Sequence, residues 1–288
     1  MSPHPNLFSR ATFATAMLAA VLFTAQDARA QELNFAGGEG PPITVDAQGG
    51  IEWRQEGQVF IARGPARAQQ GDMVLDADEL RAYYRSGAGG QNQIYRMDAV
   101  GNVRITSPGR VATGGRAIYD VDQAVVVLKD ADPVTLTSGP DVITAQKQME
   151  FWRERNLAVA RGAAKAVNAG KTIRADVLTA HFISGADGKN QVDLVEAFDK
   201  VEIKTAQERA YCDRAAYNVP TGLARLTGSV KIVRGENQIN GCSADIDLNT
   251  GVSRMNSCDP GAAKPGAVQR PGKAGRVHGV LQPDKMRK

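Results

Sequence analysis

The chain is poor in histidine, and this scarcity limits the chemistry open to it. It has 3 histidines in 288 residues, and only His181 and His278 lie beyond the first thirty. Zinc sites and histidine-assisted nucleophiles draw on histidines that the fold brings together. The composition therefore argues against a metal centre and against a serine or cysteine hydrolase. We expect no enzyme activity, with no catalytic residue, no metal ligand and no cofactor.

The glycine-rich loops that bind phosphate or dinucleotides are also missing. Gly170-Lys171-Thr172 resembles the end of a phosphate-binding loop, but Lys165 stands where that loop needs a glycine. Gly87-Ala88-Gly89-Gly90 is followed by Asn92 at the position where a dinucleotide fingerprint needs a third glycine. Both segments are better explained as turns.

Long hydrophobic runs are absent after the first thirty residues, and those thirty are typical of a secretory signal. Arg10 precedes an apolar stretch of 13 residues, Ala11–Phe23, and Ala28-Arg29-Ala30 stands before Gln31. The stretch falls short of the roughly 20 residues that span a bilayer. We expect cleavage between Ala30 and Gln31 and a mature protein in the periplasm. The alternative is an uncleaved membrane anchor.

Charge is unevenly distributed along the chain. The formal net charge is +4, of which Asp259–Lys288 contributes +5 and the first thirty residues +1, so the region between carries −2. The tail, 259–288, is rich in proline, glycine and alanine and is predicted to be disordered. It would suit anionic lipid or lipopolysaccharide phosphates, or be a solvated extension without a role. Nucleic acid is not an expected partner in this compartment.

A repeat with a period of 98 residues is the strongest pattern in the chain. Ala62–Gln93 and Ala160–Gln191 are identical at 15 of 32 positions. Within it, an apolar residue followed by a small one and an aspartate or its stand-in recurs every 30 to 36 residues, starting at Ile43, Leu75, Val111, Ile143, Ile173, Arg209 (without the apolar start) and Ile239. Sub-units this short cannot bury a core alone, so we expect them to stack.

Between these anchors the apolar residues alternate with a period of two, which indicates strands with one wet and one apolar face. The recurring segments are Gln58-Val59-Phe60-Ile61, Asn102-Val103-Arg104-Ile105, Asn156-Leu157-Ala158-Val159, Lys200-Val201-Glu202-Ile203 and Ser229-Val230-Lys231-Ile232. No sustained helical period follows Ala30. The sequence predicts an all-β, antiparallel, elongated stack of hairpins; the alternative is a globular sandwich.

The chain has three cysteines, Cys212, Cys242 and Cys258. If Asn249-Thr250-Gly251 closes a three-residue hairpin, Cys242 lies opposite Cys258 within bridging distance. Cys212 and Cys242 would lie two strands apart, about 10 Å, beyond reach. We therefore favour a Cys242–Cys258 disulfide, with free thiols as the alternative.

Several of these motifs resemble the OstA-like family over roughly Pro41–Asn256. They are Val100-Gly101-Asn102-Val103-Arg104-Ile105, the pairs Ala77-Asp78 and Ala175-Asp176, and the Tyr-x-x-x-Thr-Gly hairpin at Tyr217–Gly222. The chain departs from the Gly-Asn-Val pattern at Arg155-Asn156-Leu157, Asp199-Lys200-Val201 and Gly228-Ser229-Val230, and it has an additional basic tail. The resemblance implies a V-shaped antiparallel β-jellyroll, open at both ends, over residues 31–258.

The resemblance also implies a function. It implies a lipopolysaccharide-binding bridge protein that carries lipopolysaccharide from an inner-membrane export complex to an outer-membrane translocon for outer-membrane assembly, with those subunits as partners of like fold. Open strand edges near Ile43–Trp53 and Ile239–Met255 would invite head-to-tail association, including homo-oligomers. The alternatives are an inner-membrane-anchored relay subunit of the same route and a secreted β-solenoid enzyme acting on polysaccharide.

An apolar groove would cover acyl chains during passage through water. The pattern of alternation gives ten candidates for its lining: Val59, Ile61, Val103, Ile105, Leu157, Val159, Val201, Ile203, Val230 and Ile232. Core packing is the alternative for each.

Overall fold

The structure is a computed structural model that describes residues 43–87, 92–184, 190–247, 249–250, 252–258 and 277–280. The predicted secretory signal, its cleavage site and most of the basic tail lie outside these residues. Within them the chain forms strands and no helix. The strands are β1 (Thr44–Ala47), β2 (Ile51–Arg54), β3 (Val59–Gln70), β4 (Met73–Ser86), β5 (Asn92–Ser107), β6 (Arg110–Asp120), β7 (Val125–Lys129), β8 (Val134–Ser138), β9 (Asp141–Ala145), β10 (Gln148–Trp152), β11 (Leu157–Asn168), β12 (Lys171–Ser184), β13 (Asn190–Lys204), β14 (Arg209–Asn218), β15 (Leu223–Arg234), β16 (Asn237–Asp247), β17 (Val252–Asn256) and β18 (His278–Val280).

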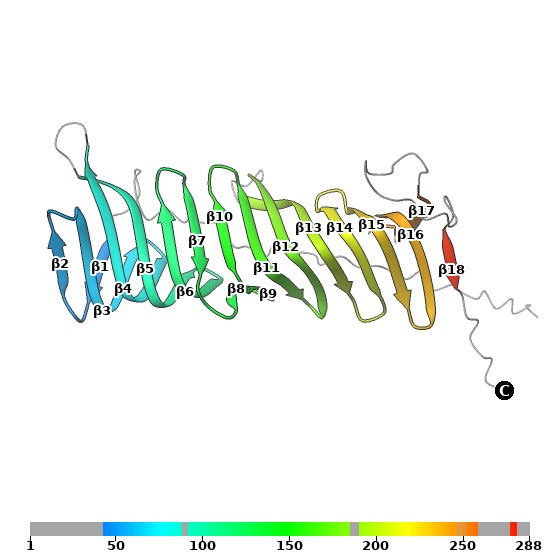
Figure 1. Cartoon of the computed structure of the whole chain (residues 1–288), viewed down its shortest axis with the longest axis horizontal. Coiled ribbons are helices and arrows are strands. Elements are labelled where there is room, and N and C mark those ends of the chain that lie inside the picture. Colours follow the sequence, from blue (N-terminus) through cyan, green and yellow to red (C-terminus); the bar gives the residue numbers. More distant parts are fainter. Residues whose placement is uncertain are drawn as a thin grey trace, which may run out of the picture.

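These strands stack along one long axis, with β1 and β2 at one end and β16 to β18 at the other (Figure 1). They form a single sheet, and all pairings among the described residues are antiparallel. The elongated all-β fold expected from the repeat is thereby confirmed. The described part of the chain contains no helix long and apolar enough to cross a bilayer.

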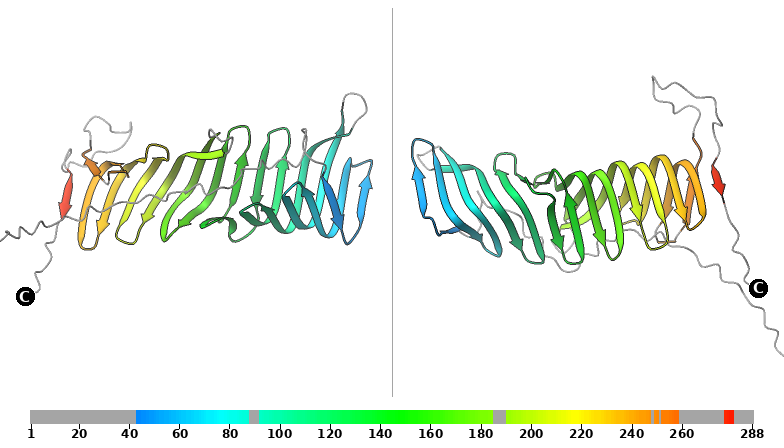
Figure 2. Two further views of the ribbon diagram at one scale, coloured as in Figure 1. Left: turned by 180° about the vertical axis from the view of Figure 1, so that it is seen from behind. Right: turned by 60° about the horizontal axis from the view of Figure 1, so that its bottom comes forward.

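The sheet is folded over into two walls, as the views from behind and below show (Figure 2). Wall 1 contains β2, β7, β10 and β17, and wall 2 contains β1, β8, β9 and β18. The long strands β3 to β6 and β11 to β16 run through both walls. For example, β2 pairs with the first half of β3 and β1 with the second half, so one long strand serves two short ones. The walls are therefore joined by continuous strands on both sides of the short strands β7 to β10.

A bulge marks the corner in the odd-numbered long strands. In β5, Val100 lies opposite Arg116 and Val103 opposite Gly114, so β5 has one residue more than its partner at this point. The two residues of β5 that lie opposite a single residue of β6 adopt left-handed conformations: φ is 78° at Gly101 and 46° at Asn102. The same corner is built at Gly64 in β3, Gly162-Ala163 in β11, Asp199-Lys200 in β13 and Gly228-Ser229 in β15.

A side-chain contact braces the corner in each repeat. Asn102 donates a hydrogen bond to Asp78 across 2.9 Å. One repeat later, Lys200 donates to Asp176 across 2.9 Å. The recurring aspartates thus act as acceptors at the corner.

The 98-residue repeat is a repeat of strands. β3 and β11 begin and end 98 residues apart, as do β4 and β12. The short pair β1 and β2 corresponds to β9 and β10, which contact β11 as β1 and β2 contact β3. In the middle of the molecule β9 and β10 also pair with β8 and β7 on their other side. The N-terminal pair has no such neighbour among the described residues.

The C-terminal edge is covered in both walls. β17 pairs with the second half of β16, and β18 pairs with Gln238–Asn240 in the first half. The open edge expected over Ile239–Met255 is therefore wrong for β16, because two short strands lie outside it. β18 comes from the segment predicted to be a disordered tail; the remainder of that segment lies outside the described residues.

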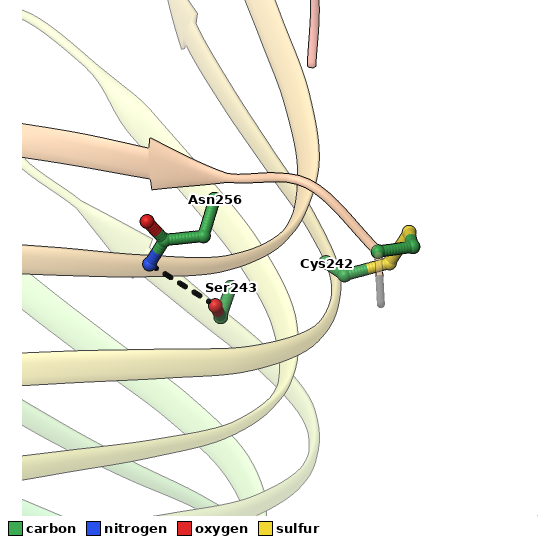
Figure 3. Close-up of a disulfide and its surroundings, with 4 residues drawn as sticks. Cys242, Ser243 and Asn256 are labelled. Carbon is green, nitrogen blue, oxygen red and sulfur yellow. Dashed lines mark hydrogen bonds between the residues drawn. A yellow bond between two sulfur atoms is a disulfide. The ribbon is translucent and has the colours of Figure 1, made fainter. Parts of the chain in front are cut away.

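Cys242 and Cys258 form a disulfide, with 5.0 Å between their Cα atoms (Figure 3). The strand register differs from the expected one by one residue, because Asn256 lies opposite Ser243 and not opposite Ala244. Asp247 accepts hydrogen bonds from the backbone amides of Asn249 and Thr250. β16 ends at Asp247 and β17 begins at Val252, so four residues and not three connect the two strands. The bridge ties the end of β17 to β16.

Corner glycines should be far less replaceable than turn glycines. A Cβ at Gly101 would collide with the Asp78 carboxylate, whereas a Cβ at Gly109, where φ is 73°, would meet nothing within 4 Å. We expect Gly109→Ala to cost about 1 kcal/mol through its backbone conformation alone. Gly101→Ala should cost about 2–4 kcal/mol, since the collision adds to the same strain. Urea unfolding of both variants measures the difference, and equal costs would contradict the corner geometry.

The three cysteines should become available to an alkylating reagent in a defined order. Burial raises the pKa of Cys212 to about 12, so almost no reactive thiolate exists at pH 8. With iodoacetamide at that pH, intact mass should show no adduct on the folded protein and one after unfolding without reductant, because Cys212 is the free cysteine. Unfolding with reductant should give three. An adduct on the folded protein would contradict the burial, and three without reductant would contradict the disulfide.

Candidate functional site

An unbroken row of apolar side chains crosses wall 1 from one end to the other. Each member lies opposite the next in the strand register, so all point to the same side of the sheet. The row is Ile51, Ala62, Leu80, Ala99, Ala117, Leu128, Met149, Ala160, Leu178, Ala197, Ala215, Leu226, Ala244 and Met255. No member carries a polar side chain.

A second unbroken row crosses wall 2. It consists of Val45, Ala68, Leu75, Ile105, Ala112, Leu136, Ile143, Ala166, Ile173, Ile203, Ala210, Ile232, Ile239 and Gly279. Four of the recurring apolar anchors of the sequence, Leu75, Ile143, Ile173 and Ile239, are members of this row. The anchor pattern therefore marks the inner face of wall 2.

The two rows face each other across the fold. One core cluster combines Ala99 and Ala117 of wall 1 with Leu75 and Ile105 of wall 2, and a second does the same in the C-terminal half. Met149 packs against both clusters, so they are continuous. We call the space between the two rows the trough.

The N-terminal end of the trough is hollow. A cavity of about 300 Å³ lies between the walls, lined by Ile43, Val45, Phe60, Leu80 and Tyr119 among others. At the end strands the apolar side chains reach solvent: Ile51 is 58% exposed and Trp53 53%. The cavity therefore lies beside an apolar mouth at this end.

Aromatic side chains form the rim of this mouth. The rings of Trp53 and Phe60 stack with 5.4 Å between centroids, and Phe60 contacts Tyr84 at 5.1 Å. Trp53 donates its Nε1 hydrogen to the Tyr84 hydroxyl across 2.7 Å. This contact fixes an exposed indole beside the mouth.

The outer face of wall 1 carries the charges, and they are paired. Asp98 is buried, which alone would raise the pKa of its carboxyl group, but hydrogen bonds from Arg96 and Arg116 outweigh burial and lower that pKa. Glu150 behaves in the same way: burial opposes ionisation, and hydrogen bonds from Arg161, Trp152 and Gln148 lower the pKa of its carboxyl group. These carboxylates stay ionised and bound to arginine, so their role is to hold neighbouring strands together.

No group of three or more histidine, cysteine or acidic side chains that could hold a metal ion occurs among the described residues. His181 lies on the outer face, 3.4 Å from Glu196. The chemistry that the inner surface offers is apolar contact.

Six of the ten predicted lining residues lie on the inner face of wall 2. Val103, Ile105, Val201 and Val230 are buried core residues, and Ile203 and Ile232 pack against the core. They follow the left-handed residues of the corner bulges. Whether they contact a ligand remains a proposal.

The other four candidates, Val59, Ile61, Leu157 and Val159, do not face the trough. Their register partners are outward residues: Ile61 lies opposite Arg81, and Val159 opposite Glu150. Val59, Ile61 and Val159 are nevertheless buried, and the register partners of Ile61 and Val159 include the long charged side chains of Arg81 and Glu150. Gln58 and Asn156 are left-handed like Asn102, but they lie in hairpin turns and not at a corner. A left-handed residue followed by alternating apolar residues therefore occurs both after hairpin turns, where the apolar side chains face outward, and after corners, where they face the trough.

Sequence reasoning also missed inner residues of wall 1, among them Phe60, Met97 and Tyr119. The signal was present, because these residues alternate with the outward ones along the same strands. Phe60 stands between Val59 and Ile61 in the sequence, and the alternation was assigned to these two aliphatic residues, which lie on the outer side, and not to Phe60.

A family model described as "LptA/(LptD N-terminal domain) LPS transport protein" matches this chain twice, over residues 45–149 and 143–252. The matches begin 98 residues apart, which is the offset of the internal repeat. No curated protein matches the chain. A similar solved structure is that of LptH from Pseudomonas aeruginosa, described as the LptA homologous periplasmic component of the conserved lipopolysaccharide transport device. It is 16% identical, covers 50% of this chain and 96% of its own, and has a TM-score of 0.40. The two family matches together span most of the described residues and confirm the OstA-like resemblance, and the chain therefore belongs to the LptA/(LptD N-terminal domain) family of LPS transport proteins.

Proposed function

We propose that this chain binds the acyl chains of lipopolysaccharide in the trough and bridges the periplasm between an inner-membrane export complex and an outer-membrane translocon. The observation that carries the proposal is the pair of unbroken apolar rows that face each other from end to end. Removing acyl chains from water is favourable by about 0.8 kcal/mol per methylene group. A covered apolar surface therefore suits a lipid that has to cross an aqueous space.

The length of the trough supports a bridging role. Fourteen strands contribute to each row, and neighbouring strands lie about 4.8 Å apart, so the rows extend about 60 Å. A globular lipid carrier would enclose its ligand at one place. This molecule offers a surface several times longer than one acyl chain.

The expected location is the periplasm, after cleavage between Ala30 and Gln31. Membership of the family supports this location, and Arg10 with the 13-residue apolar stretch supports export. An uncleaved leader would instead favour the membrane-anchored relay subunit. Both versions use the same trough.

The two ends suggest how the trough is extended. In the middle of the chain, β9 and β10 accept β8 and β7 on one side, and the repeat places β1 and β2 in the equivalent position at the N-terminal end. The N-terminal edge is therefore built to accept two further strands, from another copy or from a partner of like fold. At the other end β17 and β18 already occupy the corresponding edge, so association there requires that they move or serve as the contact.

Photo-crosslinking tests the ligand and the facing of the strands together. Phe60 and Tyr83 are aromatic residues of adjacent strands, but Phe60 lines the cavity whereas Tyr83 lies on the outer face beneath Arg96. Benzoylphenylalanine at Phe60 should label lipopolysaccharide, and the same residue at Tyr83 should give background labelling only. Equal labelling at both positions would contradict binding in the trough.

Removal of residues 277–288 tests the role of the C-terminal edge. This deletion exposes Gln238–Asn240, which now pair with β18. Because open edges favour strand addition, we expect unchanged folding and stronger concentration-dependent association in analytical ultracentrifugation. Removal of 281–288 alone keeps β18 and serves as the control. If both deletions associate like the full chain, β18 does not limit assembly.

A further inference from the structure

Two tyrosines place hydroxyl groups within a row of wall 1 whose other members are apolar from Phe60 to Ile246. Tyr119 lies opposite Met97 and Val126, and Tyr217 lies opposite Val195 and Ala224. Both therefore point to the inner side, like the row that begins at Ile51. Neither hydroxyl oxygen has a hydrogen-bond partner, and both oxygens are buried. Burial of an unpaired hydroxyl costs about 1–3 kcal/mol, a cost that phenylalanine would avoid.

The two positions are equivalent in the repeat, since they are 98 residues apart and their register partners are too. The same unpaired group therefore occurs once in each half of the trough. The inner face contains a third tyrosine, Tyr84, whose hydroxyl accepts a hydrogen bond from Trp53. The unpaired state is thus specific to Tyr119 and Tyr217 among these three.

The surroundings of the hydroxyls indicate a neutral acceptor. Tyr119 is 5% exposed and lines the cavity at the N-terminal end. The charged residues of that lining are paired: Arg81 with Glu79, and Asp98 with Arg96 and Arg116. Burial raises the pKa of both tyrosines; at Tyr119 the charges of Arg153 and Asp120 act in opposite directions, and at Tyr217 no charged group contributes. An anionic ligand group would gain nothing from charge at Tyr217, whereas an ester or amide carbonyl needs only the hydrogen that the phenol donates.

We propose that Tyr119 and Tyr217 are two equivalent polar subsites of the trough, each donating a hydrogen bond to the acyl ester or amide carbonyl of a bound amphiphile. The aliphatic chain lies along the apolar rows beside each tyrosine. Six strand spacings separate β6 from β14, so the subsites lie about 29 Å apart. This inference rests on the proposed lipid-binding function and specifies which part of the lipid the trough recognises besides its hydrocarbon.

The test uses a matched pair of soluble ligands below their critical micelle concentrations. Sucrose monododecanoate has an ester carbonyl next to its alkyl chain, and dodecyl maltoside has the same alkyl chain without a carbonyl. Tyr119→Phe, Tyr217→Phe and the double variant keep the ring and remove only the hydroxyl. Tyr83→Phe, on the outer face, is the control.

We expect the parent protein to bind the ester ligand more tightly and each inner variant to lose about five- to tenfold of that affinity, as for one hydrogen bond. Binding of dodecyl maltoside should stay unchanged. The inner variants without ligand should unfold at the same or a higher urea concentration, because an unpaired buried hydroxyl has been removed. Equal losses for both ligands would reduce the tyrosines to packing residues, and an unchanged preference for the ester would overturn the subsites.

Lipopolysaccharide itself is measured in parallel on the same variants. If the parent protein fails to bind it while the ester preference is present and is lost in the variants, the proposed function fails and the subsites stand. If lipopolysaccharide binds equally to the parent and the double variant, the trough function stands and the subsites fail.

Discussion

The structure depends on one geometric constraint, the two-residue alternation of a strand and its interruption at the corner. Without a bulge, a long strand would have to turn the corner while keeping every hydrogen bond of a regular antiparallel ladder. Two left-handed residues, Gly101 and Asn102, turn β5 at the corner and add one residue there relative to β6. Ala99 and Ile105 of β5 therefore lie six residues apart and their partners in β6, Ala117 and Ala112, five apart, and all four face inward. Because the bulge recurs at the same height in alternate long strands, the inner face stays apolar in both walls.

Paired charges distinguish the outer face of wall 1 from the apolar inner face. The outer positions of wall 1 carry arginines and carboxylates that bind one another, and their long side chains cover aliphatic residues such as Ile61 and Val159. Pairs with both partners exposed, such as Arg54 with Glu52, contribute little each, whereas the buried carboxylates of Asp98 and Glu150 depend on their arginines to remain paired. Stability comes from the two core clusters that join the walls.

Sequence reasoning identified the repeat, the strands and the inner face of wall 2, because each follows from residue types at a fixed spacing. It misplaced Val59 and Leu157, because a left-handed residue before an apolar pair marks both a hairpin turn and a corner. Only the long-range pairing separates the two. It also assigned an open edge to β16, since the covering strand β18 is three residues long and lies in a segment of low hydrophobicity. The turn at Asp247 shifts the register of the β16–β17 hairpin by one residue, and the sequence of the loop alone does not reveal this shift.

The continuity of the rows has a consequence for movement within the trough. A hydrocarbon chain that slides by one strand spacing leaves one apolar side chain and meets another of the same kind. Under the proposed function, apolar contact alone therefore favours no single position along the axis, and preferred positions come from the hydroxyl groups of Tyr119 and Tyr217. Apolar contact gives no preferred direction, so any net flow has to be imposed at the two ends, where β1 and β2 form one edge of the sheet and β17 and β18 form the other.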